Sequence, residues 1–293
     1  MKLLDVLACP YCKVGLKQEN DLLICPVCLN PYPVKNTVRH LYNSDLPHWK
    51  KIMVVNTEIA RRFPEQPQMK YEDNTWLDRV VENTPLSQRA NKVMFNVAID
   101  FFGDDLYKEE YGLEFGCAQG WSVIYLSQYK PMIGLDISNF YGLEEIPNIN
   151  KGIEKVIADG HYMPFLDNSI GIVFSCAALH HIHDRAMGVR EIYRILKPGG
   201  KYCGFGDLWT NEQSMREYWS DPDRKTEENP YGWDSMIEGR PYSKDELYRW
   251  FDIGFSKVHI QPIVYKPHMH EFGYLNIACG EEGMSNLIIM VTK

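Results

Sequence analysis

The stretch Tyr111-Gly-Leu-Glu-Phe-Gly-Cys-Ala-Gln-Gly120 decides the fold of this chain. Its first half is apolar enough for a buried strand ending at Glu114 and Phe115, and its second half is rich in small residues. Small residues let a backbone turn tightly and approach a ligand closely. The helix expected from Trp121 onward would present free N–H groups to a carboxylate. We therefore predict a strand–turn–helix unit that binds a ligand at the carboxyl end of the strand.

A dinucleotide site is the first alternative for this turn. Its fingerprint requires G-x-G-x-x-G/A, whereas the chain reads Gly116-Cys-Ala-Gln-Gly-Trp121. Trp121 falls where close packing of the helix on the strand demands a small residue. The turn also offers no spare cradle for phosphates, so we predict a cofactor that lacks them.

Strands and helices alternate after this turn, which predicts an α/β fold with a doubly wound, mostly parallel, Rossmann-like sheet. We expect strands at 132–136, 156–160, 169–174 and 201–205, and a helix at 185–196. Asp136 stands 22 residues after Glu114 at a strand end, where a carboxylate can accept both hydroxyl groups of a ribose. Asp159 ends the next strand and suits the amino group of an adenine.

Four of the eight cysteines form two C-x-x-C pairs, Cys9 with Cys12 and Cys25 with Cys28. A module of about forty residues cannot bury enough apolar surface to fold unaided. Two knuckles that offer four thiolates predict a closed, structural Zn²⁺ site. Disulfides and a redox pair are the alternatives. A redox motif of the thioredoxin type would be single and embedded in a βαβ unit, and the paired motifs at short spacing favour zinc over both. The apolar pieces at 3–7 and 22–24 are predicted to be short strands beside the knuckles.

The stretch Leu3-Leu4-Asp5-Val6-Leu7-Ala8-Cys9-Pro10, the second cysteine pair and Tyr32-Pro33-Val34 carry a first resemblance. Through them, residues 1–42 resemble the small zinc-binding activator proteins of RNA and protein methyltransferases. This resemblance implies a docking or stabilising module and no catalytic role.

A second resemblance covers residues 111–207, which resemble class I S-adenosylmethionine-dependent methyltransferases of the ubiquinone/menaquinone and small-molecule type. Their motif E/D-x-G-x-G-x-G reads Glu114-Phe-Gly-Cys-Ala-Gln-Gly120 here, with Ala118 at the central glycine. The stretches 179–184 and 196–200 match as well, while Gly171 replaces a usual acidic residue. The resemblance implies S-adenosylmethionine as the cofactor. The candidate cofactor contacts are Glu114, Gly116, Ala118, Gly120, Asp136, Ile137, Asp159, Gly160 and Ser175.

Such a cofactor already activates its methyl group, so the protein mainly aligns the reacting atoms. A base is needed only if the acceptor must lose a proton early. We name His180, His181 and Asp207 as the catalytic candidates, ahead of His161, His183 and Asp184. A metal site in the histidine run is disfavoured, since the resembling family carries histidines there without metal. Aromatic residues in the segments 209–242 and 262–283 are expected either to wall an acceptor or to pack a lid.

We therefore divide the chain into a zinc ribbon (1–42), a helical connector or cap (43–108) and a methyltransferase domain (109–293) with those two insertions. The predicted activity is methyl transfer to a small molecule such as a sugar, polyketide or quinone. A methyltransferase of rRNA or tRNA bases is one alternative, because ribosomal guanine methyltransferases join a zinc module to the same fold. A non-catalytic partner protein that docks through the ribbon is the other.

Charge and hydropathy set the remaining expectations. The net charge of −8 argues against a broad nucleic-acid surface, although a local basic patch stays open. No apolar run reaches the roughly 20 residues of a membrane span, and the first residues show no signal-peptide pattern. The clustered cysteines fit a reducing compartment, so a cytoplasmic protein is expected.

Overall fold

The computed structural model describes residues 2–42, 95–108, 110–118, 120–137, 143–146, 148, 150–182, 184–209, 244–262 and 285–293. Most of the predicted connector and nearly all of both predicted insertions lie outside these residues. Within the described part of the chain, no helix is long and apolar enough to cross a membrane.

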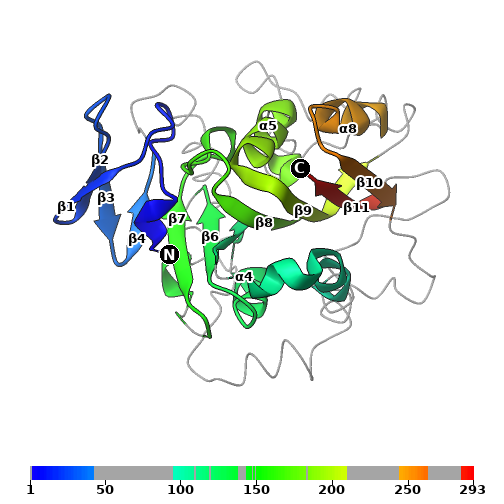
Figure 1. Ribbon diagram of the computed structural model, residues 1–293, viewed down its shortest axis with the longest axis horizontal. Helices are drawn as coiled ribbons and strands as arrows, with labels where there is room; N and C mark the ends of the chain where they lie inside the picture. The colour runs from blue at the N-terminus through cyan, green and yellow to red at the C-terminus, as the bar shows by residue number, and fades with distance from the viewer. Residues whose placement is uncertain are drawn as a thin grey trace, which may run out of the picture.

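One continuous sheet runs through the described residues, in the strand order β1-β2-β3-β4-β7-β6-β5-β8-β9-β11-β10 (Figure 1). The central strands β5 to β9 pair in parallel, and β11 is antiparallel to both β9 and β10. This arrangement confirms the predicted α/β, mostly parallel fold. The bounds are β1 (Lys17–Glu19), β2 (Leu22–Ile24), β3 (Pro31–Lys35), β4 (Val38–His40), β5 (Gly112–Phe115), β6 (Met132–Asp136), β7 (Ile153–Ile157), β8 (Ile170–Cys176), β9 (Leu196–Trp209), β10 (Lys257–Pro262) and β11 (Ser285–Thr292).

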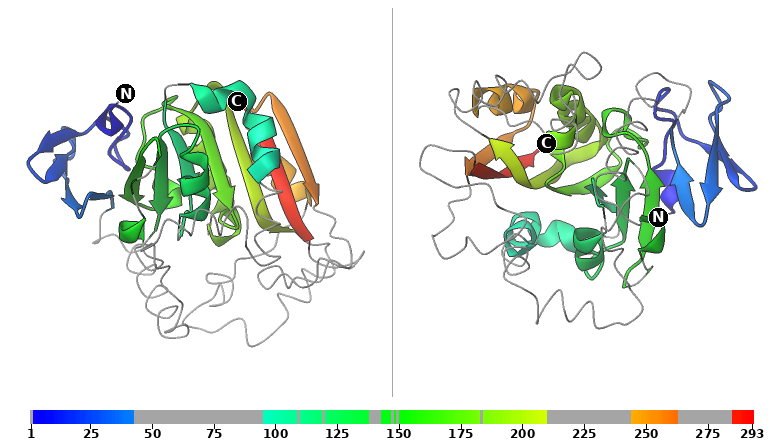
Figure 2. Two further views of the ribbon diagram at one scale, coloured as in Figure 1. Left: turned by 90° about the horizontal axis from the view of Figure 1, so that it is seen from below. Right: turned by 180° about the vertical axis from the view of Figure 1, so that it is seen from behind.

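Helices cover both faces of the central sheet, so that two apolar clusters sandwich it (Figures 1 and 2). The helices α5 (Arg185–Ile195) and α8 (Lys244–Phe251) share one cluster with the ribbon. The helix α4 (Trp121–Leu126) and the helical residues 95–102 share the other. Short 3-10 turns complete the list: η1 (Leu3–Asp5), η2 (Gly103–Tyr107), η3 (Leu143–Glu145), η4 (Gly160–Tyr162) and η5 (Leu179–His181).

The four N-terminal strands extend the central sheet at its β7 edge. β4 pairs in parallel with β7, with Val38 opposite Lys155 and His40 opposite Ile157. The pairing continues one residue further, since the Leu41 N–H donates to the Ile157 carbonyl at 2.8 Å. The ribbon is thus joined to the central sheet by backbone hydrogen bonds.

The prediction of a strand at residues 3–7 is wrong, because this piece begins with the 3-10 turn η1. Leu3, Val6 and Leu7 are all buried. Their spacing of three and four residues places them on one side of a helical turn, whereas a strand would point neighbouring side chains to opposite faces. Asp5 stabilises the turn by accepting the Lys2 backbone N–H at 2.8 Å.

The unusual glycine at position 171 has a structural reason in β8. A Cβ atom there would overlap the Oε1 atom of Glu110, which also forms an ion pair with Lys197. Gly171 therefore leaves room for a partly buried carboxylate near the amino end of the sheet.

Candidate cofactor site and cysteine cluster

The four N-terminal cysteines converge on one point. Their four Sγ atoms all lie within 4.8 Å of one another, and the Sγ atoms of Cys9 and Cys28 are 3.8 Å apart. Sulfur atoms at about 2.3 Å from a tetrahedral zinc ion are separated by about 3.8 Å. The spacing therefore fits a four-thiolate zinc site, and none of the four cysteines is in a disulfide.

Backbone N–H groups point at the sulfur atoms of both knuckles. The Cys12 N–H approaches Cys9 Sγ at 3.4 Å, and those of Val27 and Cys28 approach Cys25 Sγ at the same distance. Burial disfavours a charged Cys25, but the N–H groups of Cys28 and Val27 outweigh it and lower the Cys25 pKa to about 7. The thiolate is the form that ligates metals, so this shift favours Cys25 as a metal ligand.

The turn between β5 and α4 is held in an unusual backbone conformation. Gly116, Ala118 and Gly120 all have positive φ angles, of 68°, 43° and 79°. The Ala118 N–H donates to Oδ2 of the buried Asp136 at 2.9 Å. Asp136 at the end of β6 therefore shapes the glycine turn, besides its predicted contact with a ribose.

Glu114 is buried at the end of β5, behind this turn. Burial raises its pKa to about 8, while hydrogen bonds from Ser122 and the Val123 N–H in the first turn of α4 act in the opposite direction. Glu114 therefore caps the amino end of α4. Its Oε2 atom has no hydrogen-bond partner among the described residues, so it remains an unused buried acceptor.

Asp159 begins a hydrogen-bonded chain at the end of β7. Its Oδ1 atom accepts the His161 N–H at 2.9 Å and contacts the Nδ1 atom of the same ring at 2.6 Å. The Nε2 atom of His161 accepts the Asp184 N–H at 2.9 Å, which assigns the ring proton to Nδ1. Asp184 caps α5 by accepting the Met187 N–H at 2.9 Å. His161 therefore connects the loop after β7 to the start of α5.

The turn after β8 packs against both cofactor loops. A Cβ atom on Gly116 would overlap that of Ala178, and one on Gly160 would lie 3.0 Å from Ile182 Cδ1. Ala178 and Ile182 flank η5, which carries the two histidines predicted to be catalytic. His180 is buried and His181 is exposed, with ring centroids 4.2 Å apart.

Three further residues of the predicted site are Ser175, Ile137 and Asp207. Ser175 is fully buried in β8, and its hydroxyl pairs with that of Tyr202 on β9 at 2.9 Å. That hydrogen bond joins two strands of the sheet. The contact of Ser175 with a cofactor stays a prediction. Ile137 directly follows β6. Asp207 lies in β9 opposite Leu287 of β11, and its side chain is outside the described part.

Sequence reasoning missed several contacts that build this site. It did not pair Ala178 with Gly116, or Ala118 with Asp136, and it treated His161 only as one of several possible bases. These partners lie at the ends of different strands, far apart in the sequence, so no local sequence pattern predicts their contacts. The one sequence signal that could have marked Ala118 is its place at the central glycine of the motif, a position that favours an unusual backbone conformation.

Gly116 should tolerate substitution poorly. Gly116→Ala is expected to lower the free energy of unfolding by about 2–4 kcal/mol, from left-handed backbone strain together with the overlap on Ala178. Gly103 provides the control, since its φ is 55° but no atom lies within 4 Å of an added Cβ. Gly103→Ala should cost only about 1–2 kcal/mol. Chemical denaturation measures both, and equal losses would contradict the packing of Ala178 on Gly116.

The comparison with protein families locates the site within a known domain. Residues 113–204 match the family described as "Methyltransferase domain". This match makes residues 113–204 similar to a methyltransferase domain. It includes the glycine turn, Asp136, Asp159 and η5, and it ends within β9.

Curated relatives match this chain over limited lengths. The human mitochondrial arginine-hydroxylase NDUFAF5 is 26% identical over 142 residues, which are 46% of this chain and 39% of that protein. The demethylmenaquinone methyltransferase of Corynebacterium glutamicum is 40% identical over 52 residues, 18% of this chain and 23% of that protein. The chain thus spans well under half the length of these relatives.

Solved structures share the fold over a larger part of the chain. Geranyl diphosphate C-methyltransferase from Streptomyces coelicolor A3(2), in complex with Mg²⁺, geranyl diphosphate and S-adenosyl-L-homocysteine, matches with a TM-score of 0.56 and 13% identity. The match covers 86% of this chain and 99% of that one. At 13% identity this similarity shows a shared fold.

Proposed function

We propose that this protein transfers the methyl group of S-adenosylmethionine to a small-molecule acceptor. The observation that carries the proposal is the packing of three loops at the carboxyl edge of the sheet. The glycine turn after β5 contacts Asp136 at the end of β6, and the residues that flank η5 after β8 pack against Gly116 and Gly160. Ligands of doubly wound sheets bind at this edge.

The polar groups at this edge of the sheet suit S-adenosylmethionine. Asp136 would accept the ribose hydroxyls, and Asp159 with Gly160 would receive the adenine. The turn from Gly116 to Gly120 contains no lysine or arginine, as expected for a ligand without phosphates. The amino end of α4 would lie near its carboxylate. When bound, S-adenosylmethionine supplies a methyl group on a positively charged sulfur, and buried carboxylates nearby favour such a cation.

The histidines after β8 would act on the acceptor. η5 adjoins the cofactor turn through Ala178, so a ligand bound in that turn would have His181 beside it. A neutral histidine can accept a proton from an acceptor group as it is methylated. Asp207, on the neighbouring strand β9, is the second candidate for this role.

His181→Ala should lower turnover by about tenfold to a hundredfold while leaving cofactor affinity within about twofold, since the lost group acts on the acceptor side. Single-turnover kinetics and calorimetry with S-adenosylhomocysteine separate the two effects. His259→Ala, an exposed histidine on the edge strand β10, is the matched control and should change neither. A loss of cofactor affinity equal to the loss of turnover would remove His181 from the acceptor side.

The acceptor class can be tested without knowing the acceptor. Protein is incubated with cell extract and S-adenosylmethionine carrying an isotopically labelled methyl group, and labelled products are separated by size before mass spectrometry. A small-molecule methyltransferase should label the low-mass fraction, and ribonuclease should leave the signal unchanged. Labelled RNA would favour the alternative of a base methyltransferase. Absence of any labelled product, with S-adenosylmethionine binding lost as well, would favour a non-catalytic partner protein.

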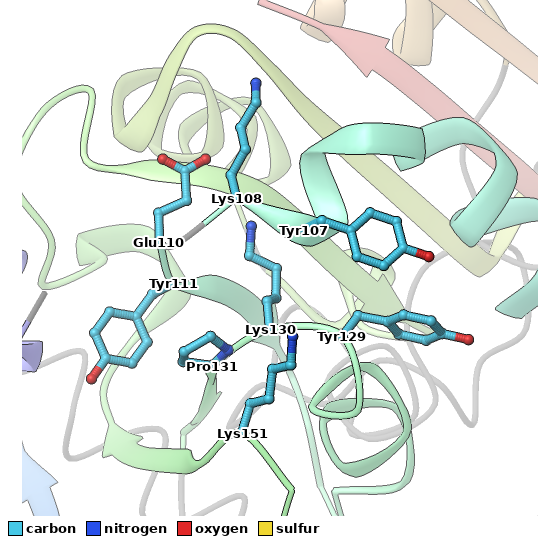
Figure 3. A pocket seen from close by; sticks show the side chains of 8 residues that line it. All are labelled: Tyr107, Lys108, Glu110, Tyr111, Tyr129, Lys130, Pro131 and Lys151. Atoms are coloured by element: carbon cyan, nitrogen blue, oxygen red, sulfur yellow. The ribbon is translucent and has the colours of Figure 1, made fainter.

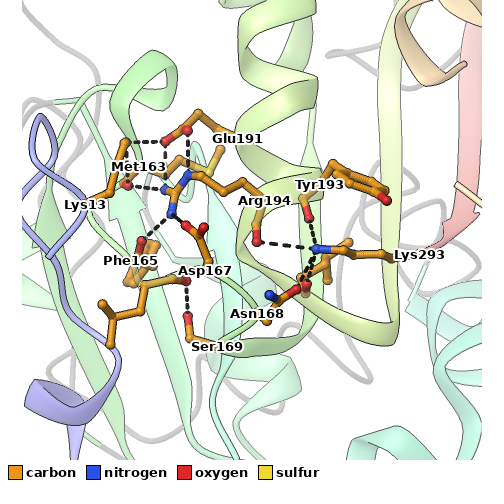
Figure 4. A network of polar contacts seen from close by, with 12 residues as sticks. Lys13, Met163, Phe165, Asp167, Asn168, Ser169, Glu191, Tyr193, Arg194 and Lys293 are labelled. Atoms are coloured by element: carbon orange, nitrogen blue, oxygen red, sulfur yellow. Dashed lines mark hydrogen bonds and ion pairs between the residues drawn. The ribbon is translucent and has the colours of Figure 1, made fainter. Parts of the chain in front are cut away.

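We further propose that Cys9, Cys12, Cys25 and Cys28 bind one structural zinc ion. The first knuckle contacts the chain's own methyltransferase domain: Lys13 Nζ pairs with Glu191 of α5 at 2.6 Å and approaches the Met163 carbonyl at 3.4 Å (Figure 4). Arg194 extends the network by pairing with Glu191 and Asp167, both at 2.7 Å. Because this face of the ribbon is occupied within the chain, it supports a stabilising role better than the docking of another protein.

A further inference from the structure

An open pocket of about 310 Å³ lies at the amino ends of the central strands, where residues precede β5, β6 and β7 (Figure 3). The carboxylates of the proposed cofactor site end the same strands, so the pocket is at the opposite edge of the sheet. Its basic and aromatic lining comprises Lys108, Lys130, Lys151, Tyr107, Tyr111 and Tyr129.

The carboxylates near this pocket already have lysine partners. Asp105 pairs with Lys108 at 2.5 Å and with Lys201 at 2.9 Å. Glu110 pairs with Lys197. Among the described residues, no carboxylate forms an ion pair with Lys130 or Lys151. Among the described lining residues, three lysines stand against one carboxylate, that of Glu110, so positive charge is in excess there although the whole chain carries −8.

Lys130 is only 1% exposed, and no ion pair joins it to a carboxylate among the described residues. Its Nζ atom donates to the Asp105 backbone carbonyl at 2.8 Å. Burial lowers the Lys130 pKa to about 8, against the opposing effect of Glu110 and Asp105. A buried ammonium is costly unless it is paired. An anion in the pocket would give Lys130 a charged partner in addition to that backbone carbonyl.

We propose that this lysine pocket binds a phosphorylated small molecule, whose phosphoryl group is neutralised by Lys130 and Lys151. A phosphoryl dianion matches two ammonium groups in charge, and lysine binds phosphate as a point charge. The rings of Tyr107 and Tyr129, whose centroids are 6.1 Å apart, would contact the organic part of the ligand. The volume is within the range of small-molecule pockets. This site is separate from the proposed methyl transfer and does not depend on it.

Inorganic pyrophosphate and uridine 5′-monophosphate are suitable probes. They are titrated into the full chain by calorimetry, with S-adenosylhomocysteine present so that the cofactor site is saturated. Both should bind saturably, and uridine, which lacks the phosphate, should not. Lys151→Gln should weaken both probes by about fivefold or more, since it removes a charge-assisted contact at an exposed side chain. Lys130→Met should also weaken both probes, and it is used if its circular dichroism spectrum matches that of the original protein.

Lys17→Gln is the matched control, because Lys17 is an exposed lysine on β1 of the ribbon. It should leave the affinity for both probes unchanged. Absence of saturable binding, or equal weakening by Lys17→Gln and Lys151→Gln, would overturn the proposal. Tighter and strongly salt-dependent binding of a short single-stranded RNA would overturn it too, in favour of a nucleic-acid contact.

Discussion

Asp136→Ala is expected to weaken the binding of S-adenosylmethionine by about tenfold to a hundredfold, the usual cost of losing a charged hydrogen-bond partner. The structure adds a second reason for a large effect. Asp136 accepts the Ala118 N–H at 2.9 Å, so its removal would also release the turn that receives the cofactor. Calorimetry with S-adenosylmethionine measures the loss directly.

Asp136→Asn separates these two contributions, since its side chain can still accept the Ala118 N–H but carries no charge. Its affinity should fall between those of the original protein and Asp136→Ala. Asp167→Ala is the control, because Asp167 is an exposed carboxylate that pairs with Arg194 away from the glycine turn. It should bind normally. Unchanged affinity in Asp136→Ala would refute the assignment of this site.

Removal of the proposed zinc ion should destabilise the whole described structure, not only the ribbon. Structural zinc contributes about 10–16 kcal/mol of apparent binding free energy to folding in small zinc modules. Here the ribbon is hydrogen-bonded to the methyltransferase domain at several points. Besides the pairing of β4 with β7, the Ala8 N–H donates to the Pro164 carbonyl at 2.9 Å, and the Leu166 N–H donates to the Val6 carbonyl at the same distance.

Loss of the zinc ion should also disturb the proposed cofactor site. Tyr11, inside the first knuckle, contacts the ring of Tyr162 with a centroid separation of 5.5 Å. Tyr162 belongs to η4, directly after Asp159. Disorder in the knuckle would therefore remove a packing contact from the loop that is proposed to hold the adenine. We expect chelation to lower both the melting temperature and the affinity for S-adenosylmethionine, and added zinc to restore both.

Metal analysis should find one zinc ion per chain. Cys25→Ser should reduce the zinc content and melt at a lower temperature, whereas Cys176→Ser, a cysteine outside the ribbon, should keep its zinc. Native protein that contains no zinc, or a melting temperature that chelation leaves unchanged, would contradict the proposed metal site.

Local patterns in the sequence were enough to predict the class of fold. The alternation of strands and helices predicted the mostly parallel sheet, and the small residues after Phe115 predicted a tight turn. These patterns are readable because each depends on residues a few positions apart, whose spacing follows the period of a strand or helix. The same reasoning went wrong at residues 3–7, where a 3-10 turn buries the apolar side chains that a strand was expected to carry.

Tertiary structure decided how these pieces meet. The sheet places β4 beside β7, and it brings Lys13 to Glu191 across 178 positions of the chain. It brings Ala178 onto Gly116, and it gathers Lys130 and Lys151 around one pocket at the amino ends of the strands. Such contacts follow from the spatial order of strands, which is set by packing apolar faces against helices on both sides. The strand order brings together residues that are far apart in the sequence and share no periodic pattern. Only the folded structure therefore shows these contacts.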